Sequence, residues 1–429
     1  MSKTYLKPAP EPPAIRDAMA RASRRQERGE PVYDFSSGNI GRLLMEYNPF
    51  QDISVDTGRM PESFEPVAKA LARGMQKAFA CKPQGLSYSP TGGTEAQRRT
   101  AIQYFKKIHG VPLSEEDTHR VMITVGGQQS MAAALRSLSP EAKVIAPRWD
   151  YAPVTGIASD EPWEFCKLSP QEGLGFSLDD LREEATDGAV FYTSMPNNPS
   201  GYVSAEKLRK AAEIMVQAGG GVIWDAPYLF TMFRIIGGQA KFDPDFLENQ
   251  VEKFAVVAEE FSENMCITSS LSKSCLIAGL RFGFATAPPD WIQNMEAIVG
   301  RENLSSPTAS FIMGDEVFQA FLEEEVYTYQ WATEILVDRV NYLLEREIPL
   351  ILPDNGKFGA LYVLVEAPER GNSYAEKLGQ QGVISVTAEP FYGKAVDAVR
   401  LSLVAVPYVE EDRLWKENVD KLAAVVGEL

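Results

Sequence analysis

A lysine among small hydroxyl side chains is the clearest chemical feature of this sequence. Lys273 follows Ser270 by three positions, and Arg281 lies eight positions further on. A lysine held away from water has a lowered pKa, and its neutral amine can form a Schiff base with an aldehyde. A hydroxyl and a guanidinium nearby suit a phosphate group. Because pyridoxal 5'-phosphate (PLP) carries both an aldehyde and a phosphate, the segment indicates a PLP site. The alternative is a solvated lysine and arginine on the surface.

Three further polar side chains could hold the ring of such a cofactor. Asp225 follows the apolar run 222–224, and its carboxylate could keep a pyridine nitrogen protonated, which makes the ring an electron sink. Asn198 lies in the proline-rich turn 196–201, and both it and Tyr228 could bind the phenolic oxygen of the cofactor. The alternative for Asp225 is a helix N-cap or a turn.

Phosphate, ring and carboxylate contacts each have a further candidate. Gly126, Gly127 and Gln128 follow a predicted strand and open a helix, where backbone N–H groups bind phosphate. Trp149 could stack on a flat cofactor, although a core tryptophan is an equally simple interpretation. Arg400 lies within an apolar strand candidate, where a buried guanidinium needs an anion. That anion could be a substrate carboxylate or a structural ion-pair partner.

Alternating helices and short apolar strands must position these residues. The predicted strands of the first part cover 120–125, 143–146, 189–193, 221–224 and 265–268. Unalternated strands between helices indicate an α/β fold with a mainly parallel sheet covered on both faces. The candidate residues follow strand ends, where open α/β sheets bind ligands.

The rest of the chain indicates a smaller α/β domain. We expect a helical stretch from Met313 to Arg346, then strands and a closing helix. At the other end, a proline-rich arm with Pro8, Pro10 and Pro12 precedes a helix over 14–29. We therefore divide the chain into three parts: 1–50 as N-terminal arm and part of the small domain, 51–305 as the large PLP-binding domain, and 306–429 as the small C-terminal domain.

Composition narrows the class of protein. The chain has 429 residues and a net charge of −17, which disfavours nucleic-acid binding. The four cysteines are scattered, and the two histidines, His109 and His119, are expected to be exposed, so no metal site is predicted. No run is apolar enough for a signal core or a membrane helix. A reducing cytoplasm is the default location.

The candidate residues occur in an order that covers nearly the whole chain, and in this order the chain resembles the class I/II aminotransferases. These are PLP enzymes of the aspartate aminotransferase fold family, or fold-type I. The matching pieces are Gly38, Tyr88 within 87–93, Gly126-Gly127-Gln128, Pro147-Arg148-Trp149, Asn198 before Pro199-Ser200-Gly201, Asp225 with Tyr228, Ser270-Leu271-Ser272-Lys273, Arg281 and Arg400.

The resemblance implies a role for each residue around the cofactor. Lys273 would form the internal aldimine and carry the proton, Asp225 would pair with the pyridinium, and Trp149 would stack on the ring. Asn198 and Tyr228 would bind the phenolic oxygen. The phosphate would be held by Gly127, Gln128, Ser270 and Arg281.

The resemblance also implies a substrate, a partner and a reaction. Arg400, with Gly38 nearby, would bind the α-carboxylate of an amino acid, and Tyr88 would reach the active site of the neighbouring subunit in a homodimer. The reaction would be ping-pong transfer of an amino group from an L-amino acid, with aspartate or an aromatic donor favoured, to a 2-oxo acid such as 2-oxoglutarate. Arg42 and Arg301 are candidates for binding a second carboxylate.

Two alternatives stay open at this point. A PLP-dependent C–S lyase would use the same residues for β-elimination, because a fold does not determine a reaction. A non-catalytic regulator on the PLP fold is the more remote alternative. The chain also departs from the family: Ser200 replaces a commoner threonine, the 48 positions from Asp225 to Lys273 suggest an insertion around 236–262, and the segment 389–393 lacks a usual glycine.

Overall fold

The computed structural model describes residues 13–47, 61–81, 84–323, 326–409 and 411–428. The expected arm with Pro8, Pro10 and Pro12 lies outside the described residues, as do residues 51–60 at the start of the expected large domain. The helix expected over 14–29 is present as α1 (Ala14–Glu27).

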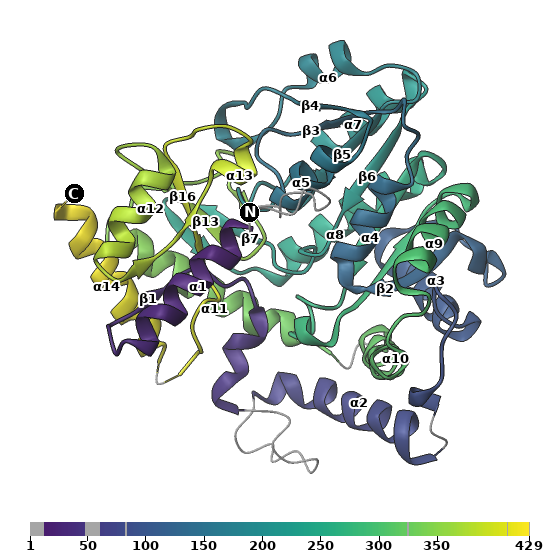
Figure 1. Ribbon diagram of the computed structural model, residues 1–429, viewed down its shortest axis with the longest axis horizontal. Coiled ribbons are helices and arrows are strands. Elements are labelled where there is room, and N and C mark those ends of the chain that lie inside the picture. Colours follow the sequence, from purple (N-terminus) through teal and green to yellow (C-terminus); the bar gives the residue numbers. More distant parts are fainter. Residues whose placement is uncertain (1–12, 48–60, 82–83, 324–325, 410, 429) are drawn as a thin grey trace, which may run out of the picture.

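A seven-stranded sheet forms the centre of the larger part of the molecule (Figure 1). Its strands stand in the order β2-β10-β9-β6-β5-β3-β4. Only β10 runs antiparallel to its neighbours, so the expectation of a mainly parallel sheet is confirmed. The strands are β2 (Val121–Val125), β3 (Lys143–Ala146), β4 (Glu164–Lys167), β5 (Val190–Ser194), β6 (Gly221–Asp225), β9 (Met265–Ser270) and β10 (Phe282–Thr286).

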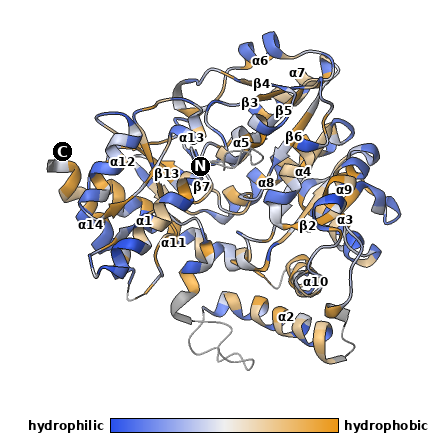
Figure 2. Cartoon of the chain, viewed as in Figure 1, coloured by the Kyte–Doolittle hydropathy of each residue, from blue (hydrophilic) through white to orange (hydrophobic). Residues whose placement is uncertain are grey.

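Helices cover both faces of this sheet. Along β6, Val222 and Trp224 belong to one buried apolar cluster and Ile223 to another, because successive side chains of a strand point to opposite faces. This explains why the strands are apolar without alternation (Figure 2). The helices of this part are α2 (Glu65–Gln76), α3 (Glu95–His109), α4 (Gly126–Arg136), α5 (Ala152–Asp160), α6 (Leu178–Glu184), α7 (Ala205–Gln217), α8 (Pro244–Phe261), α9 (Pro289–Asn303) and α10 (Thr308–Leu322).

Local signals explain where several of these helices begin. Thr94 and Gln97 form a reciprocal capping box at the start of α3, and Ser204 and Asp243 cap α7 and α8 through their side chains. Helix α3 ends at Gly110, whose φ of 63° is the left-handed conformation that favours glycine.

Both ends of the chain build the smaller domain. Strand β1 (Tyr33–Asp34) pairs in parallel with β14 (Val383–Ile384), and α1 packs against β14 (Figure 1). An antiparallel sheet in the order β11-β13-β16-β15 lies next to them. The remaining elements are α11 (Thr328–Glu345), β11 (Leu350–Ile351), β12 (Lys357–Phe358), β13 (Tyr362–Glu366), α12 (Gly371–Gln380), β15 (Val386–Thr387), α13 (Glu389–Tyr392), β16 (Ala398–Ser402) and α14 (Arg413–Glu428).

Three details differ from or refine the sequence expectations. The single helical stretch expected from Met313 to Arg346 consists of two helices, α10 and α11. The sequence did not reveal the break because both helices carry enough apolar residues to continue the helical pattern across it. The expected insertion contains the end of a hairpin, β7 (Phe233–Ile236) and β8 (Gln239–Lys241), and then α8.

His109 is fully buried, contrary to expectation, while His119 is exposed as expected. The His109 ring packs among Tyr104, Phe105 and Trp224, and burial lowers its pKa to about 3. Its position in the last turn of α3 therefore faces the core rather than solvent. Within the described residues, no helix is long and apolar enough to cross a membrane.

Candidate active site

Lys273 lies in the turn that follows β9, at the carboxyl end of the central sheet. Its Nζ donates a hydrogen bond to the carbonyl oxygen of Gly38 at 2.9 Å and stands 5.8 Å from the ring centroid of Tyr228. Burial lowers the pKa of Lys273; Tyr362 opposes this shift, whereas the positive charges of Arg281 and Arg400 add to it. The amine is therefore easier to deprotonate than an exposed lysine, which is what a Schiff-base or proton-transfer lysine requires.

Asp225 is the last residue of β6 and lies one strand away from the β9 end. Its carboxylate accepts hydrogen bonds from the Thr268 hydroxyl at 2.7 Å and from the Tyr192 hydroxyl at 3.3 Å. Burial raises the pKa of Asp225 to about 6, although both hydrogen bonds act to lower it. A buried carboxylate in this condition favours a cationic partner, and a protonated ring nitrogen fits that requirement.

Asn198 connects the phenol of Tyr228 with the guanidinium of Arg400. Its Nδ2 donates to the Tyr228 hydroxyl at 3.4 Å, and its Oδ1 accepts from Arg400 Nη1 at 3.3 Å. The turn that carries Asn198 is itself held by Ser200, whose hydroxyl donates to Asn197 Oδ1 at 2.5 Å. The serine that replaces a commoner threonine thus has a structural role in shaping this turn.

Arg400 is fully buried in β16, and its guanidinium lies between two aromatic rings. The guanidinium carbon is 4.0 Å from the ring centroid of Tyr362 and 4.6 Å from that of Phe391. Two of its nitrogens, Nε and Nη2, are buried without a hydrogen-bond partner. No carboxylate of the described residues forms an ion pair with Arg400, so the structural ion pair considered from the sequence is not observed. The two unpaired donors match a carboxylate ligand.

The start of α4 lies beside Ser270 at the end of β9 and Arg281 just before β10. A Cβ added to Gly126, which has a φ of 74°, would lie 2.6 Å from Arg281 Nη2. A Cβ added to Gly127 would lie 3.6 Å from the Ser270 hydroxyl oxygen. The two glycines thus leave space beside a guanidinium, a hydroxyl and the helix start, and this combination fits a phosphate. The Gln128 side chain is exposed.

Trp149 follows β3 and is buried beside the turn of Asn198. Its carbonyl oxygen accepts a hydrogen bond from Asn197 Nδ2 at 3.0 Å. Its ring lies 4.5 Å from that of Tyr392 in α13, tilted by 53°. The tryptophan therefore stands where the small domain contacts the large one, next to the residues described above.

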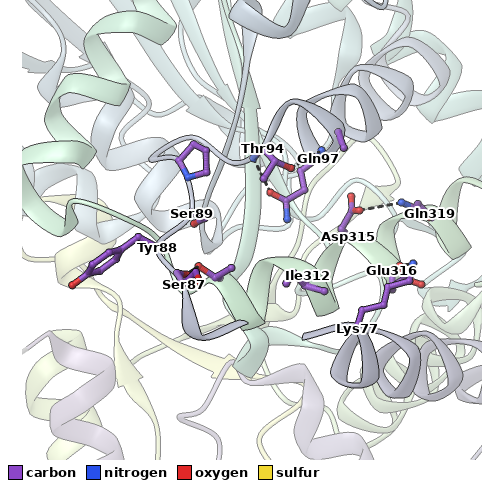
Figure 3. Close-up of a pocket in the computed structure, with 13 residues that line it drawn as sticks. Lys77, Ser87, Tyr88, Ser89, Thr94, Gln97, Ile312, Asp315, Glu316 and Gln319 are labelled. Atoms are coloured by element: carbon purple, nitrogen blue, oxygen red, sulfur yellow. Dashed lines mark hydrogen bonds and ion pairs between the residues drawn. The ribbon is translucent and has the colours of Figure 1, made fainter. Parts of the chain in front are cut away.

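Tyr88 is the predicted residue that the structure keeps apart from the others. It is 87% exposed and lines a cavity of about 670 Å³ between α2, α3 and α10. None of the other predicted site residues lines this cavity. Figure 3 shows the Tyr88 ring directed away from Gln97 and Asp315.

The two candidate arginines for a second carboxylate have different surroundings. Arg42 Nη1 forms an ion pair with Asp34 at 2.8 Å and donates to the Ala405 carbonyl oxygen at 2.5 Å. Arg301 is exposed in the last turn of α9. Arg42 is therefore engaged within the small domain, whereas Arg301 faces solvent.

Four site residues were missed by reasoning from sequence: Tyr151, Tyr192, Thr268 and Tyr362. Thr268 of β9 stands opposite Asp225 of β6 in the strand register. It could be identified only once the pairing of these two strands was known. Tyr362 pairs with Ser402 in the strand register. Ser402 and Arg400 are two positions apart on β16, so Tyr362 and Arg400 lie on the same face of the sheet. Charge interactions with Asp225, Arg281, Arg400 and Tyr362 place Tyr151 at the same site.

Comparison with known proteins agrees with this geometry. The family described as aminotransferase class I and II matches residues 53–413. The chain is 26% identical over 351 residues to a probable aspartate/prephenate aminotransferase of Thermus aquaticus, which covers 78% of this chain and 81% of the relative. It is 25% identical over 402 residues to an aspartate aminotransferase of Pyrococcus horikoshii, covering 89% of this chain and 94% of that protein.

Solved structures support the fold. An aspartate aminotransferase from Thermus thermophilus with maleate superposes with a TM-score of 0.76 at 19% identity, covering 98% of this chain and all (100%) of that one. At this identity the likeness concerns the fold. Together with the family match over residues 53–413, it shows that this chain belongs to the class I and II aminotransferases.

Proposed function

We propose that the chain is a PLP-dependent aminotransferase that moves an amino group from an L-amino acid to a 2-oxo acid such as 2-oxoglutarate, by ping-pong kinetics. Aspartate or an aromatic amino acid is the favoured donor. The observation that carries the proposal is the buried Arg400 guanidinium, whose two unpaired N–H donors stand in the same site as the Lys273 amine. An amino acid offers a carboxylate for the first group and, once joined to the cofactor, a removable Cα proton for the second.

The residues present fit the cofactor that the family uses. Bound PLP would supply a carbonyl carbon for the amino group and an electron sink for the substrate. Asp225 would bind the ring nitrogen, and Asn198 with Tyr228 would bind the phenolic oxygen. Trp149 would cover the ring. The phosphate would lie against Gly127, Gln128, Ser270 and Arg281. We assign this cofactor site to the large domain expected over residues 51–305, to which α10 also belongs because it packs against α2 and α3, while the chain from α11 onward forms the smaller domain together with part of the N-terminal segment 1–50.

The chain's own groups then have separate tasks. Arg400 binds the α-carboxylate of the substrate beside Gly38, and the aromatic rings of Tyr362 and Phe391 exclude water from the guanidinium. This orients the Cα–H bond toward Lys273. Because the pKa of Lys273 is lowered, its neutral Nζ accepts the Cα proton and returns it at a later stage.

A second copy of the chain would complete the site. Exposed large apolar side chains stand next in sequence to residues that line the Figure 3 cavity: Phe79 follows Lys77 by two positions, and Leu86 and Tyr88 flank Ser87. Exposed apolar side chains gathered in this way indicate a protein interface. We propose a homodimer in which Tyr88 reaches the phosphate of the neighbouring site, and the exposed Arg301 is available to a second carboxylate.

Single-donor half-reactions test the proposed function. The PLP-loaded protein is mixed with one amino acid at a time, without a 2-oxo acid, and the cofactor absorption is followed together with the products. We expect a stoichiometric 2-oxo acid and conversion of the cofactor to its amine form, with aspartate or aromatic donors fastest. Lys273→Ala should lose this reaction, whereas Lys253→Ala, on the exposed side of α8, should keep it.

Two outcomes would contradict the proposal. Accumulation of pyruvate and ammonia over many turnovers without an acceptor would indicate β-elimination instead. Full turnover by Lys273→Ala would remove the lysine from the reaction.

A further inference from the structure

Tyr362 is a buried tyrosine whose hydroxyl has no task in the proposed reaction. It begins β13 in the small-domain sheet and is 4% exposed. In the strand register it stands opposite Ser402, and its ring reaches diagonally under the guanidinium of Arg400. A cation over an aromatic face is attracted to it, so the ring supports Arg400.

The hydroxyl of Tyr362 lies at the other end of the ring, beside Gly38. A Cβ added to Gly38 would lie 2.0 Å from this hydroxyl, so the absence of a side chain at position 38 makes room for it. The same Gly38 accepts the hydrogen bond of Lys273 Nζ through its carbonyl oxygen. One tyrosine therefore contacts Arg400 with its ring and approaches Lys273 with its hydroxyl.

The charges around Tyr362 agree with this position. Burial acts to raise the pKa of the phenol, but the positive charges of Lys273 and Arg400 lower it overall. In return, Tyr362 acts to raise the pKa of Lys273. The other groups that face this pair are Arg281, which lowers the pKa of Lys273, and Tyr151, which interacts with Tyr362.

We propose that Tyr362 is a positioning residue that joins substrate binding to proton transfer: its ring holds Arg400 toward the substrate carboxylate, and its hydroxyl holds the Lys273 amine. The inference rests on the proposed function for the identity of the substrate. The position of the Tyr362 hydroxyl and of Lys273 Nζ beside the same Gly38 does not depend on it. Because the ring would support Arg400 and the hydroxyl would hold Lys273, we expect two different substitutions of Tyr362 to separate the two functions.

The first measurement uses the protein without PLP. Lys273 is acetylated with acetic anhydride at a series of pH values, and its modification is quantified by mass spectrometry. In Tyr362→Phe, we expect the midpoint pH for Lys273 to fall by about one unit, a tenfold change in neutral amine at a fixed pH. Tyr374→Phe, a buried tyrosine of α12 in the same domain, is the matched control and should label as the unsubstituted protein does.

The second measurement is steady-state kinetics of the PLP-loaded variants. Tyr362→Phe keeps the ring, so we expect KM for the amino acid to change less than about threefold while kcat falls about tenfold. Its pH–rate profile should move in the same direction as the labelling midpoint. Tyr362→Leu also removes the ring, and we expect KM to rise about tenfold in addition.

The outcomes separate this inference from the proposed function. An unchanged Lys273 midpoint and unchanged kcat in Tyr362→Phe would overturn the role of the hydroxyl. An unchanged KM in a folded Tyr362→Leu would overturn the role of the ring. If no donor reacts with the unsubstituted protein but the labelling midpoint still moves, the proposed function fails and the contact between Tyr362 and Lys273 is supported.

Discussion

Burial controls the chemistry of individual residues in this site. Lys273 and Arg400 are enclosed, and each therefore interacts strongly with the few polar groups that it meets. Lys273 interacts with the carbonyl oxygen of Gly38 and the phenol of Tyr362. Arg400 interacts with the amide oxygen of Asn198 and the rings of Tyr362 and Phe391. Neither has a carboxylate partner among the described residues, so the positive charge of each is available to an anionic ligand.

Asp225 shows how this burial affects stability. Its pKa is raised to about 6 from 3.8, so the folded state binds the carboxyl proton more tightly than the unfolded state does. Its contribution to the free energy of unfolding is therefore greatest below pH 4 and is lost as the pH rises to about 6. At pH 7.5 the ionised carboxylate should cost up to about 3 kcal/mol in the protein without PLP.

Asp225→Asn tests this sign. Without PLP, we expect the variant to be more stable than the unsubstituted protein at pH 7.5 and no more stable at pH 4, by thermal or urea denaturation. With PLP, the order at pH 7.5 should reverse, because the variant lacks the charge that would pair with the ring nitrogen. A variant that is less stable without PLP at both pH values would show that the two hydroxyl hydrogen bonds outweigh the cost of burial.

At the scale of elements, α13 links the substrate side of the site to the central sheet. The carbonyl oxygen of Phe391 accepts hydrogen bonds from Lys167 Nζ at 2.8 Å and from the backbone N–H of Asp150 at 3.4 Å. The Phe391 ring also flanks Arg400. The segment 389–393, which departs from the family pattern, is therefore anchored at the ends of β3 and β4.

Lys167→Met should weaken this anchor. Burial lowers the pKa of Lys167 to about 8 and raises that of nearby Asp150 to about 7, and the substitution removes both the hydrogen bonds and the charge. We expect the free energy of unfolding to fall by about 1–3 kcal/mol, the cost of a buried polar group left unpaired. KM for the amino acid should rise about tenfold, with a smaller change in kcat.

A matched substitution distinguishes this effect from general damage. Lys207→Met also replaces a half-buried lysine, but one that lies over Phe176 and Tyr202, away from α13. It should leave KM unchanged. If Lys167→Met loses stability without any change in KM, α13 does not position the carboxylate site.

At the scale of the whole molecule, the central question is whether one chain suffices. Both ends of the chain meet in the small domain, and the site lies between this domain and the central sheet (Figure 1). Tyr88, however, is exposed at a separate cavity, and Phe79 and Leu86, which adjoin other lining residues in the sequence, are exposed too. This arrangement is explained if a second copy covers that surface and receives Tyr88.

The double substitution Phe79→Asp, Leu86→Asp should produce a monomer. Charged side chains are costly in an apolar interface, and without the partner's Tyr88 we expect activity to fall at least about tenfold. Light scattering after gel filtration gives the mass, and donor half-reactions give the activity. Val256→Asp, at an exposed apolar position of α8, should change neither. A monomeric, fully active unsubstituted protein would refute the dimer.

The sequence by itself determined the type of fold and identified most residues of the candidate site. Asp225, Asn198, Lys273 and Trp149 each follow a predicted strand, and ends of parallel strands meet at one edge of a sheet. Short apolar runs and capped helices are local signals, so the order of elements could be predicted although α10 and α11 were merged. His109 was placed wrongly because one helical turn cannot show which side faces the core.

Tertiary structure alone decided which side chains surround the lysine. Tyr362 and Arg400 come from neighbouring small-domain strands, and their contact depends on a register that no single strand encodes. Arg42 was a substrate candidate by residue type, but the folded chain pairs it with Asp34. The packing of distant segments of the chain also decided that Tyr88 lies apart from the other candidate residues. The chemistry of each residue type is local, whereas its neighbours, burial and pKa are properties of the folded molecule.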